Sequence, residues 1–368
     1  MRIAYVCYVT AVVPDGVSRK ITTQAAHWRR AGHEVEVRCL SPAAGSGTAA
    51  STLGGRVFSF RGPAARVRAT LTLASDVRRM APDIVYLRYD RFVPPLPPAL
   101  WPLPVVVEIN TDDRRETSLY RRAGWLYNEL NRVATLGFAA GLVCVTNELA
   151  RSRSFSVYRK PTVVIANGAD PDEIAIAPPA ANERPAAVML VGAMAPWAGV
   201  DKVVALAAAA PELDVHVIGA EVAEAGARLP PNVHLYGALA PAQYGRLLAG
   251  ADFGIGPLAL HRKGMSEASP LKVREYLLHG LPVLTAHEDT DFPGQDPWFV
   301  LRLPNTEDNV ASGLPAIRAW VASVRGRRVP REEVVGRVGA DAKEAARLAF
   351  LDGLLDGAGR ISVSPAAG

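Results

Sequence analysis

Short runs of valine, isoleucine and leucine alternate with longer helical patterns along most of this 368-residue sequence. Continuous apolar runs predict strands buried on both faces, and strands separated by helices are typical of parallel sheets with crossover connections. In the first half of the chain we expect a helix at 17–31, ended by Gly32. The strands of a first doubly wound sheet are predicted at 2–8, 35–37, 83–87, 105–109, 141–145 and 162–165.

This alternation is interrupted between residues 171 and 187, where prolines and scattered charges predict an interdomain linker. The chain exceeds what one hydrophobic core usually organises, so the predicted fold is α/β with two Rossmann-like domains facing across a cleft. These are residues 1–178, on which a C-terminal helix at about 345–365 is a candidate to pack back, and residues 186–344. The tail from 331 to 355 is expected to be helical. The second sheet would use strands at 186–191, 213–218, 233–235, 253–255 and 281–284.

The composition indicates a folded protein without a nucleic-acid surface. Hydrophobic residues make up 49% of the chain and charged residues 21%, and the net charge is +5 with a pI near 9.2. The arginines are scattered and are not interleaved with aromatic rings, as a nucleic-acid platform would require. A mildly basic surface leaves open a weak peripheral contact with an anionic membrane. No pair of histidines has the spacing of metal ligands, so no metal site is expected.

The cysteines and the N-terminus indicate a cytoplasmic protein. Cys7, Cys39 and Cys144 lie in or at the ends of strand-like runs and have neither metal nor disulfide spacing, which favours reduced thiols. The N-terminus lacks the length and cleavage region of a signal peptide. The longest apolar stretch, around 133–145, is too short to span a bilayer. No feature of the sequence predicts an oligomeric state.

The most informative segment is 266–283, SEASPLKVREYLLHGLPV, which predicts a loop, a helix, a stop and a strand. Ser269 suits the N-cap and Pro270 the first helical position. Glu267 would precede the helix and Glu275 would lie in its second turn. A carboxylate can accept two hydrogen bonds from a vicinal diol, and the N–H groups at a helix start suit a diphosphate. The pattern also fits an ordinary amphipathic helix with two exposed glutamates.

In this segment the chain resembles the GT-B glycosyltransferases, specifically the large retaining family known as family 4. The E-x7-E element from Glu267 to Glu275 is similar to the donor signature of that family. The resemblance covers essentially the whole sequence and is weakest between 40 and 80 and after 300. Further matches are PDGVS at 14–18, ANGAD at 166–170, and a turn in which Val191-Gly192 is followed by WAGVDK at 197–202.

The resemblance implies a role for each of these elements. Glu275 would hold the ribose hydroxyls and Glu267 the transferred sugar, with backbone N–H groups around Ser269–Leu271 facing the sugar or the phosphates. The turns at Gly16 and Gly192 would bring the backbone close to the donor, where a Cβ would block the approach. The nucleotide sugar would be a co-substrate, and no bound cofactor is expected.

Two positions at which the family usually carries cations are alanines here, Ala193 and Ala198. Such cations neutralise the leaving diphosphate, which is a large part of the catalysis. Lys272, in the first turn of the helix, is the first candidate to substitute for them. If no cation does, either the donor carries fewer phosphates or the enzyme is slow or inactive. The other candidate cations are Arg262, Lys263 and Arg19.

A second departure follows the strand at 105–109, where many relatives carry a histidine near the reacting sugar carbon and this chain has Asn110. Asn110 could hydrogen-bond a sugar hydroxyl but cannot act as a base at neutral pH. Glu108 could act as a base, or it could have a structural role, such as pairing with Arg88. The candidate catalytic residues are therefore Glu267, Asn110 and Glu108.

The sequence as a whole predicts a retaining glycosyltransferase that moves a sugar from a nucleotide-diphosphate sugar to an acceptor hydroxyl. The acceptor could belong to a natural product, a glycan or a lipid-linked molecule. The resemblance implies that the leaving diphosphate accepts the proton of the acceptor on the same face. One alternative is a GT-B epimerase or hydrolase that acts on the sugar nucleotide itself. Another is a catalytically impaired binding subunit, for which Ala193, Ala198 and Asn110 argue.

Overall fold

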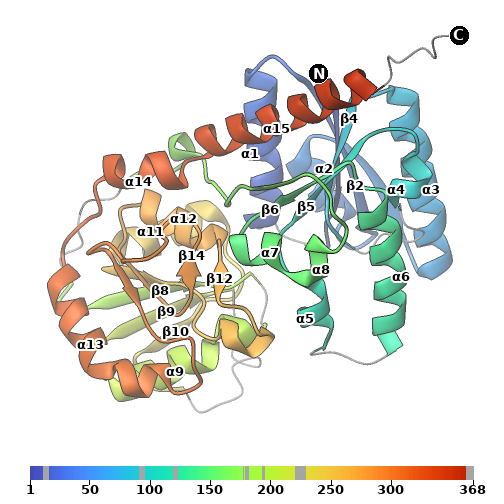
Figure 1. The fold of residues 1–368 in the computed structure, drawn as a ribbon. Coiled ribbons are helices and arrows are strands. Elements are labelled where there is room, and N and C mark those ends of the chain that lie inside the picture. The colour runs from blue at the N-terminus through green and yellow to red at the C-terminus, as the bar shows by residue number, and fades with distance from the viewer. Residues whose placement is uncertain are drawn as a thin grey trace, which may run out of the picture. The chain divides into compact units, whose positions relative to one another are not determined.

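The computed structural model describes residues 1–10, 16–90, 96–118, 123–176, 178, 182–192, 195–219 and 229–361. Two compact units divide the chain (Figure 1). Unit 1 combines Met1–Ala166 with Asp341–Gly368, and unit 2 is Asn167–Ala340. The chain thus leaves unit 1 after Ala166 and returns to it at Asp341.

Unit 1 is built on a seven-stranded parallel sheet of order β3-β2-β1-β4-β5-β6-β7, which reverses at β1. Its central strands are buried on both faces, which explains their continuous apolar runs. The predicted strands are confirmed, and the structure adds β3, which sequence analysis did not identify. The strands are β1 (Arg2–Tyr8), β2 (Glu34–Pro42), β3 (Arg56–Phe60), β4 (Ile84–Arg88), β5 (Val105–Ile109), β6 (Gly141–Cys144) and β7 (Thr162–Val164).

The helices of unit 1 include one from the far end of the chain. The first, α1 (Gly16–Arg30), ends just before Gly32, which has a φ of +88° and permits the sharp stop that was predicted. The last, α15 (Ala340–Ile361), runs beside α1 (Figure 1) and places Leu348 and Leu351 in the same apolar core as Trp28. The others are α2 (Ser46–Leu53), α3 (Pro63–Met80), α4 (Leu96–Leu100), α5 (Asp113–Ser118), α6 (Ala123–Gly137), α7 (Asn147–Arg151) and α8 (Arg153–Ser156).

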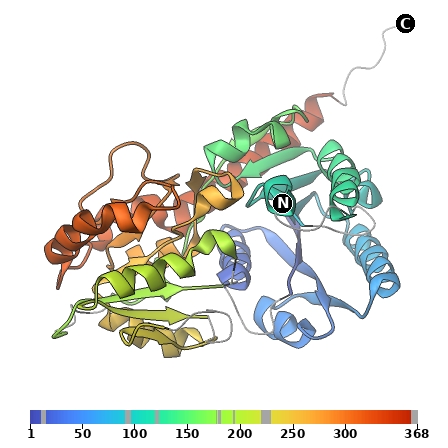
Figure 2. The ribbon, with the colours of Figure 1, turned by 90° about the horizontal axis from the view of Figure 1, so that it is seen from below.

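Unit 2 repeats this architecture on a six-stranded parallel sheet of order β10-β9-β8-β11-β13-β15. Alternate residues of its strands enter two different cores: Met189 packs with one set of helices and Val188 with the other. The sheet is therefore covered on both faces (Figure 2). The strands are β8 (Ala186–Leu190), β9 (Asp214–Ile218), β10 (Val233–Leu235), β11 (Phe253–Ile255), β13 (Val283–Thr285) and β15 (Val300–Arg302), and β12 (Glu267–Ala268) pairs with β14 (Glu288–Asp289) apart from them.

The helices of unit 2 divide between the two faces of its sheet. One core contains residues of α9 (Val200–Ala209) and α13 (Asn309–Val324). The other contains residues of α11 (Pro241–Gly250), α12 (Leu271–Leu278) and α14 (Arg331–Val338). The informative segment at 266–283 therefore lies on the α11/α14 face, with α12 packed on the sheet.

The tail that was expected to be helical over 331–355 consists of two helices, α14 and α15. Gly339 separates α14 from α15, with an extended backbone at φ −69° and ψ 152°. A Cβ at Gly339 would lie 2.5 Å from the carbonyl oxygen of Val335, so the tight exit from α14 requires glycine there. The break lies next to the point, between Ala340 and Asp341, at which the chain passes from unit 2 to unit 1.

The predicted linker at 171–187 begins as part of unit 2. Pro171–Glu173 forms a 3-10 turn whose Pro171 carbonyl accepts a hydrogen bond from Arg331 at 3.0 Å. Ile174 is buried in the core that contains α12. The boundary between the units accordingly falls between Ala166 and Asn167, ahead of the proline-rich stretch.

Candidate functional site

The carboxyl ends of the central strands are the first place to look for a ligand, because open parallel sheets bind ligands where the strand order reverses. In unit 2 this point lies at β8, between β9 and β11. Gly192 lies two residues after the end of β8, and a Cβ built there would meet no atom of the described residues within 4 Å. Gly192 is thus at an open turn, as a backbone that approaches a ligand requires. Ala193, one of the two alanines at expected cation positions, lies outside the described residues.

Helix α12 begins one residue later than predicted. Pro270 occupies the N-cap position, Leu271 is the first helical residue, and the N-cap residue makes no capping hydrogen bond with its side chain. The Ser269 hydroxyl is not the expected cap, because it accepts a hydrogen bond from the Asn167 N–H at 2.8 Å. The Ser269 carbonyl oxygen accepts a second hydrogen bond, from the side-chain amide of Asn167, at 2.5 Å. Ser269 therefore fixes the loop before α12 and leaves the first helical N–H groups without a side-chain cap.

Both glutamates of the E-x7-E element are buried, unlike those of an ordinary amphipathic helix. Glu267 lies on β12 and Glu275 in the second turn of α12, with 8% and 5% of their surface exposed. Glutamate is rarely so buried unless its carboxylate has partners. One oxygen of Glu275 accepts a hydrogen bond from the Tyr244 hydroxyl at 2.8 Å. A carboxylate held in this way is preorganised to accept further hydrogen bonds.

Lys272 reaches from α12 to the end of β8. Its ammonium donates a hydrogen bond to the carbonyl oxygen of Leu190, and burial lowers its pKa to about 8. One turn further along α12, the Tyr276 hydroxyl accepts a hydrogen bond from the Leu190 N–H at 2.6 Å. These two side chains fix α12 against the strand that leads into Gly192. A cation is thus placed beside the open turn, although its sequence position is far from that turn.

The other candidate cations are arranged differently. Arg262 donates to both carboxylate oxygens of Asp201, at 2.8 and 2.7 Å, and also pairs with Glu307, so its charge is neutralised locally. Lys263 lies over the Trp197 ring at 4.7 Å. Ala198 is buried in a 3-10 turn just before Gly199, which has a φ of +76°. Among the cations considered for unit 2, Lys272 has the placement that best suits the turn after β8.

A buried ion pair connects Arg274, also on α12, to β14 and the segment after it. Its guanidinium binds Asp289 and Asp291, and it donates to the Asn167 carbonyl at 3.1 Å. These contacts join the E-x7-E helix to the strand that pairs with Glu267. Sequence analysis did not identify Arg274 because a single arginine on a helix ordinarily indicates a solvent-exposed face. Its role is to position α12 and β12 relative to each other.

In unit 1 the residues at the end of β5 belong to one polar network around Lys20. The Lys20 ammonium lies 2.9 Å from a carboxylate oxygen of Glu108 and donates to the Asn110 side-chain oxygen at 2.9 Å. The Asn110 amide nitrogen donates to the other Glu108 oxygen at 3.2 Å. The opposite charges of Lys20 and Glu108 thus fix the orientation of the Asn110 amide. Gly16 begins α1, one turn before Lys20, and residues 11–15 lie outside the described residues.

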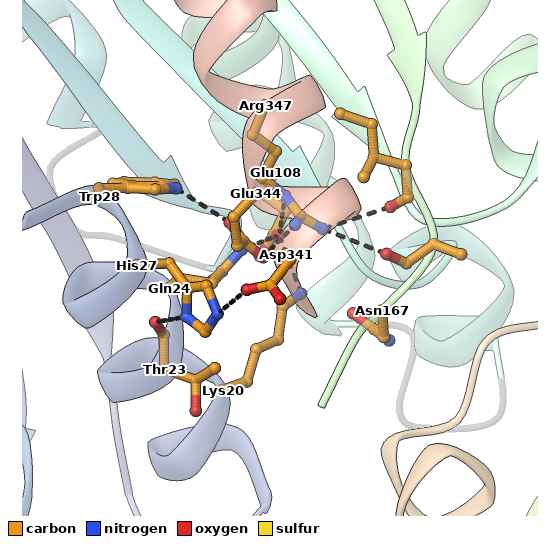
Figure 3. Close-up of polar contacts among 12 residues, drawn as sticks. Lys20, Thr23, Gln24, His27, Trp28, Glu108, Asn167, Asp341, Glu344 and Arg347 are labelled. Atoms are coloured by element: carbon orange, nitrogen blue, oxygen red, sulfur yellow. Dashed lines mark hydrogen bonds and ion pairs between the residues drawn. The ribbon is translucent and has the colours of Figure 1, made fainter. Parts of the chain in front are cut away.

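Glu108 is enclosed by cations and by the Tyr86 hydroxyl; Figure 3 shows Lys20 and Arg347 beside it. Arg88 and Arg347 lie 3.5 and 3.6 Å from its oxygens, and the Tyr86 hydroxyl donates at 2.9 Å. Burial alone would raise the pKa of Glu108, but Lys20, Arg347 and Arg88 outweigh it and hold the pKa well below its usual range. A buried carboxylate of low pKa is a poor base. This geometry favours the structural role, pairing with Arg88, over general-base catalysis.

Lys20 gives the first testable prediction. Burial lowers its pKa to about 7, although Glu108 opposes the shift. In the unfolded chain the Lys20 ammonium has a pKa of about 10.5, so above pH 7 folding releases its proton. The free energy of unfolding therefore increases as the pH rises. The free energy of unfolding of the wild type, relative to Lys20→Met, should therefore increase between pH 6.5 and 8.5 by on the order of 1 kcal/mol. Urea unfolding of both proteins measures this; a difference independent of pH would mean that Lys20 stays charged throughout.

In the described part of the chain, no group of three or more histidine, cysteine, aspartate or glutamate side chains is arranged to hold a metal ion. The same residues contain no helix long and apolar enough to cross a membrane. The three cysteines are free and buried.

Comparison with known proteins identifies the fold. Residues 14–173 match the family model described as Glycosyltransferase Family 4. No curated protein sequence matches the chain. Among solved structures, the sucrose-phosphate synthase of Thermosynechococcus elongatus is similar at 13% identity, with a TM-score of 0.68 over 97% of this chain and 100% of that one. The Anabaena HepE protein in complex with UDP and glucose has 14% identity and a TM-score of 0.65, covering 95% and 99%. A UDP-N-acetylglucosamine 2-epimerase has 13% identity and a TM-score of 0.56, covering 100% of both chains.

The two doubly wound parallel sheets, together with these structures, show that the protein has the GT-B fold. Within that fold the chain is similar to the glycosyltransferases of family 4, as its motifs implied, and the comparisons support a glycosyltransferase. The family match lies almost entirely in unit 1. The assignment of a donor site to unit 2 therefore rests on the geometry of α12 and its neighbours.

Proposed function

We propose that the protein is a retaining glycosyltransferase that transfers a sugar from a nucleotide-diphosphate sugar to an acceptor hydroxyl. The observation that carries this proposal is the pair of buried glutamates on either side of the uncapped start of α12. Glu275 would accept hydrogen bonds from the ribose diol and Glu267 from the transferred sugar. The diphosphate would lie at the free N–H groups of Leu271 and Lys272, where the helix dipole favours negative charge.

Lys272 would stabilise the charge that develops on the leaving diphosphate. It is held beside the turn after β8 by the carbonyl of Leu190, and its pKa of about 8 leaves it mostly protonated at neutral pH. In this way it would replace the cations absent from Ala193 and Ala198. The acceptor proton would pass to the leaving diphosphate on the same face, so that no side chain need act as the base. Asn110, oriented by Lys20 and Glu108, would offer hydrogen bonds to a sugar hydroxyl.

The role of Lys272 leads to a prediction for kcat. Replacing Lys272 with methionine should lower kcat about a hundredfold, because a group aimed at developing charge typically contributes a factor of this size. Lys272→Arg should recover part of the loss, since the charge remains. Lys263→Met, which removes another of the cations considered for unit 2, is the matched control and should have less than about a threefold effect. An equal loss in the two methionine variants would contradict the assignment to Lys272.

A test of the transferase reaction is turnover of the donor with and without acceptor. The proposal expects release of the nucleoside diphosphate only when an acceptor hydroxyl is present, with the sugar found on the acceptor by mass spectrometry and the anomeric configuration of the donor retained. The structural likeness to a UDP-N-acetylglucosamine 2-epimerase favours a second candidate, an enzyme acting on the sugar nucleotide alone. Donor conversion without any acceptor would support that candidate. Nucleotide binding without turnover would support a binding subunit.

We further propose a cytoplasmic location. The three cysteines are buried and free, which suits a reducing compartment. A nucleotide-sugar donor is the co-substrate in this proposal, and neither a bound cofactor nor a nucleic-acid partner is part of it.

A further inference from the structure

Helix α6 has its amphipathic pattern reversed with respect to the protein interior. Leu126, Leu130 and Val133 recur at helical spacing on one face and are 61–65% exposed. The opposite face is buried and mostly polar: Asn128, Asn131, Arg132 and Thr135 are each at most 2% exposed, beside the buried Leu136. A surface helix of a globular protein ordinarily directs its apolar stripe towards the core. The reversal leaves an apolar stripe in contact with water.

Polar contacts within unit 1 fix this orientation. The Arg132 guanidinium pairs with Asp113 of α5 and donates to the carbonyl of Ser154. The Asn128 amide donates to Asp113 at 2.6 Å. Turning the apolar stripe inwards would break a buried ion pair, which is strongly destabilising. The exposed stripe is therefore a fixed property of unit 1.

The apolar stripe extends beyond α6. Phe138, just after the helix, and Trp101, just after α4, are 52% and 65% exposed, and their rings meet edge-to-face at 6.4 Å. We define the α6 apolar face as Trp101, Leu126, Leu130, Val133 and Phe138. In Figure 1, α6 lies at the outside of unit 1 beside α4 and α5, with which it is in contact.

Basic side chains border this face. Arg78 donates to the carbonyl of Trp101 at 2.6 Å, and Lys160 donates to the carbonyl of Gly137, next to Phe138, at 2.7 Å. Both are bound to backbone oxygens, in a protein whose net charge is +5. Neither contact involves a carboxylate. The α6 apolar face thus combines tryptophan, phenylalanine and leucine with a positive border, the composition of surfaces that lie in a membrane interface.

We propose that the α6 apolar face docks on the interface of an anionic lipid bilayer, with its rings and aliphatic side chains among the acyl-chain ends and Arg78 and Lys160 against the headgroups. Charge complementarity decides between a bilayer and a second copy of the chain. In a two-fold dimer through this face the same positive border would meet itself, whereas anionic headgroups would neutralise it. This inference does not depend on the identity of the donor or the acceptor.

The test is sedimentation of the full-length protein with sucrose-loaded vesicles of pure phosphatidylcholine or of phosphatidylcholine with 30% phosphatidylglycerol. The proposal expects binding to the anionic vesicles at least tenfold stronger than to the neutral ones, weakened severalfold when NaCl is raised from 0.1 to 0.5 M. Leu130→Glu should reduce the partition coefficient on anionic vesicles at least tenfold. Ile176→Glu in unit 2 makes the same change of charge at another exposed apolar residue and should bind as the wild type does.

Several results would overturn the proposal. One is equal loss of binding in Leu130→Glu and Ile176→Glu, which would indicate a general charge effect. Another is failure of the wild type to bind anionic vesicles at 0.1 M salt. A third is a dimer in light scattering that Leu130→Glu converts to a monomer, which would assign the face to a second copy. Because Leu130 is exposed, the variant should keep the wild-type melting temperature, and that measurement separates lost docking from lost folding.

Discussion

Replacing Arg347 with methionine should lower the free energy of unfolding by about 3–5 kcal/mol, because removing one partner of a buried ion pair leaves an uncompensated buried charge. Arg347 is fully buried on α15 and binds the carboxylates of Glu344 and Glu108. It also donates to the carbonyls of Ile165 and Ala166, at 3.4 and 3.3 Å. These two residues end the N-terminal segment of unit 1. Methionine fills similar space but supplies none of these donors. Urea unfolding followed by circular dichroism measures the effect.

Lys343→Met is the matched control, because it removes a positive charge from a half-buried position of the same helix. It should cost less than about 1 kcal/mol. The double variant Arg347→Met/Glu344→Gln should be less destabilised than the two single effects predict together, since each partner's desolvation cost arises mainly from loss of the other. Additive effects would show that Arg347 and Glu344 do not act as a pair. A loss below 1 kcal/mol for Arg347→Met would contradict the proposed role of α15 in unit 1.

Replacing Glu275 with glutamine should weaken binding of the donor nucleotide about a hundredfold. A carboxylate that accepts two hydrogen bonds from a ribose diol contributes about 1.5–3 kcal/mol for each bond to the charged group, and an amide cannot accept both as strongly. Glutamine can still accept the bond from Tyr244, so the fold of α12 should persist. The dissociation constant of the nucleoside diphosphate, measured by titration calorimetry, reports the effect.

Two controls separate this role from a structural one. Tyr244→Phe removes only the hydroxyl that supports Glu275 and should weaken nucleotide binding by less than about tenfold. Glu332→Gln changes an exposed glutamate of the same unit and should leave the affinity unchanged. If Glu275→Gln binds every nucleotide as tightly as the wild type while its melting temperature falls, Glu275 supports α12 and does not contact the ligand.

The sequence predicts most of the fold because its strands belong to parallel sheets. β1 and β5 are buried on both faces and therefore appear as uninterrupted apolar runs. β3 does not have this property, since Arg56 and Ser59 are exposed, and it was not identified. The tail was expected to be helical because alanine and leucine recur at helical spacing. The break at Gly339, where close contact with Val335 requires glycine, has no such signal in the sequence.

The residues of the candidate site were predictable where they lie together in the chain, and not where the fold brings distant segments together. Glu267, Lys272 and Glu275 occupy one short segment with helix signals. Lys20 has no such signal, because a lysine on an amphipathic helix ordinarily indicates a solvated face, and its partner Glu108 is 88 positions later (108 − 20). Arg347 joins the same cluster from the last helix of the chain. Pairings at such separations depend on the sheet order, which local patterns do not specify.

The central claim is that unit 2 binds the nucleoside diphosphate of a sugar donor at the start of α12. The most direct test is a thermal-shift panel of UDP, GDP, ADP, TDP and the matching monophosphates on the wild type, Glu275→Gln and Lys272→Met, since a ligand that binds only the folded state raises the melting temperature. We predict that one diphosphate raises the melting temperature of the wild type more than its monophosphate does, and that both variants reduce this difference. A panel without any shift in the wild type, or a shift that persists in both variants, would contradict the claim.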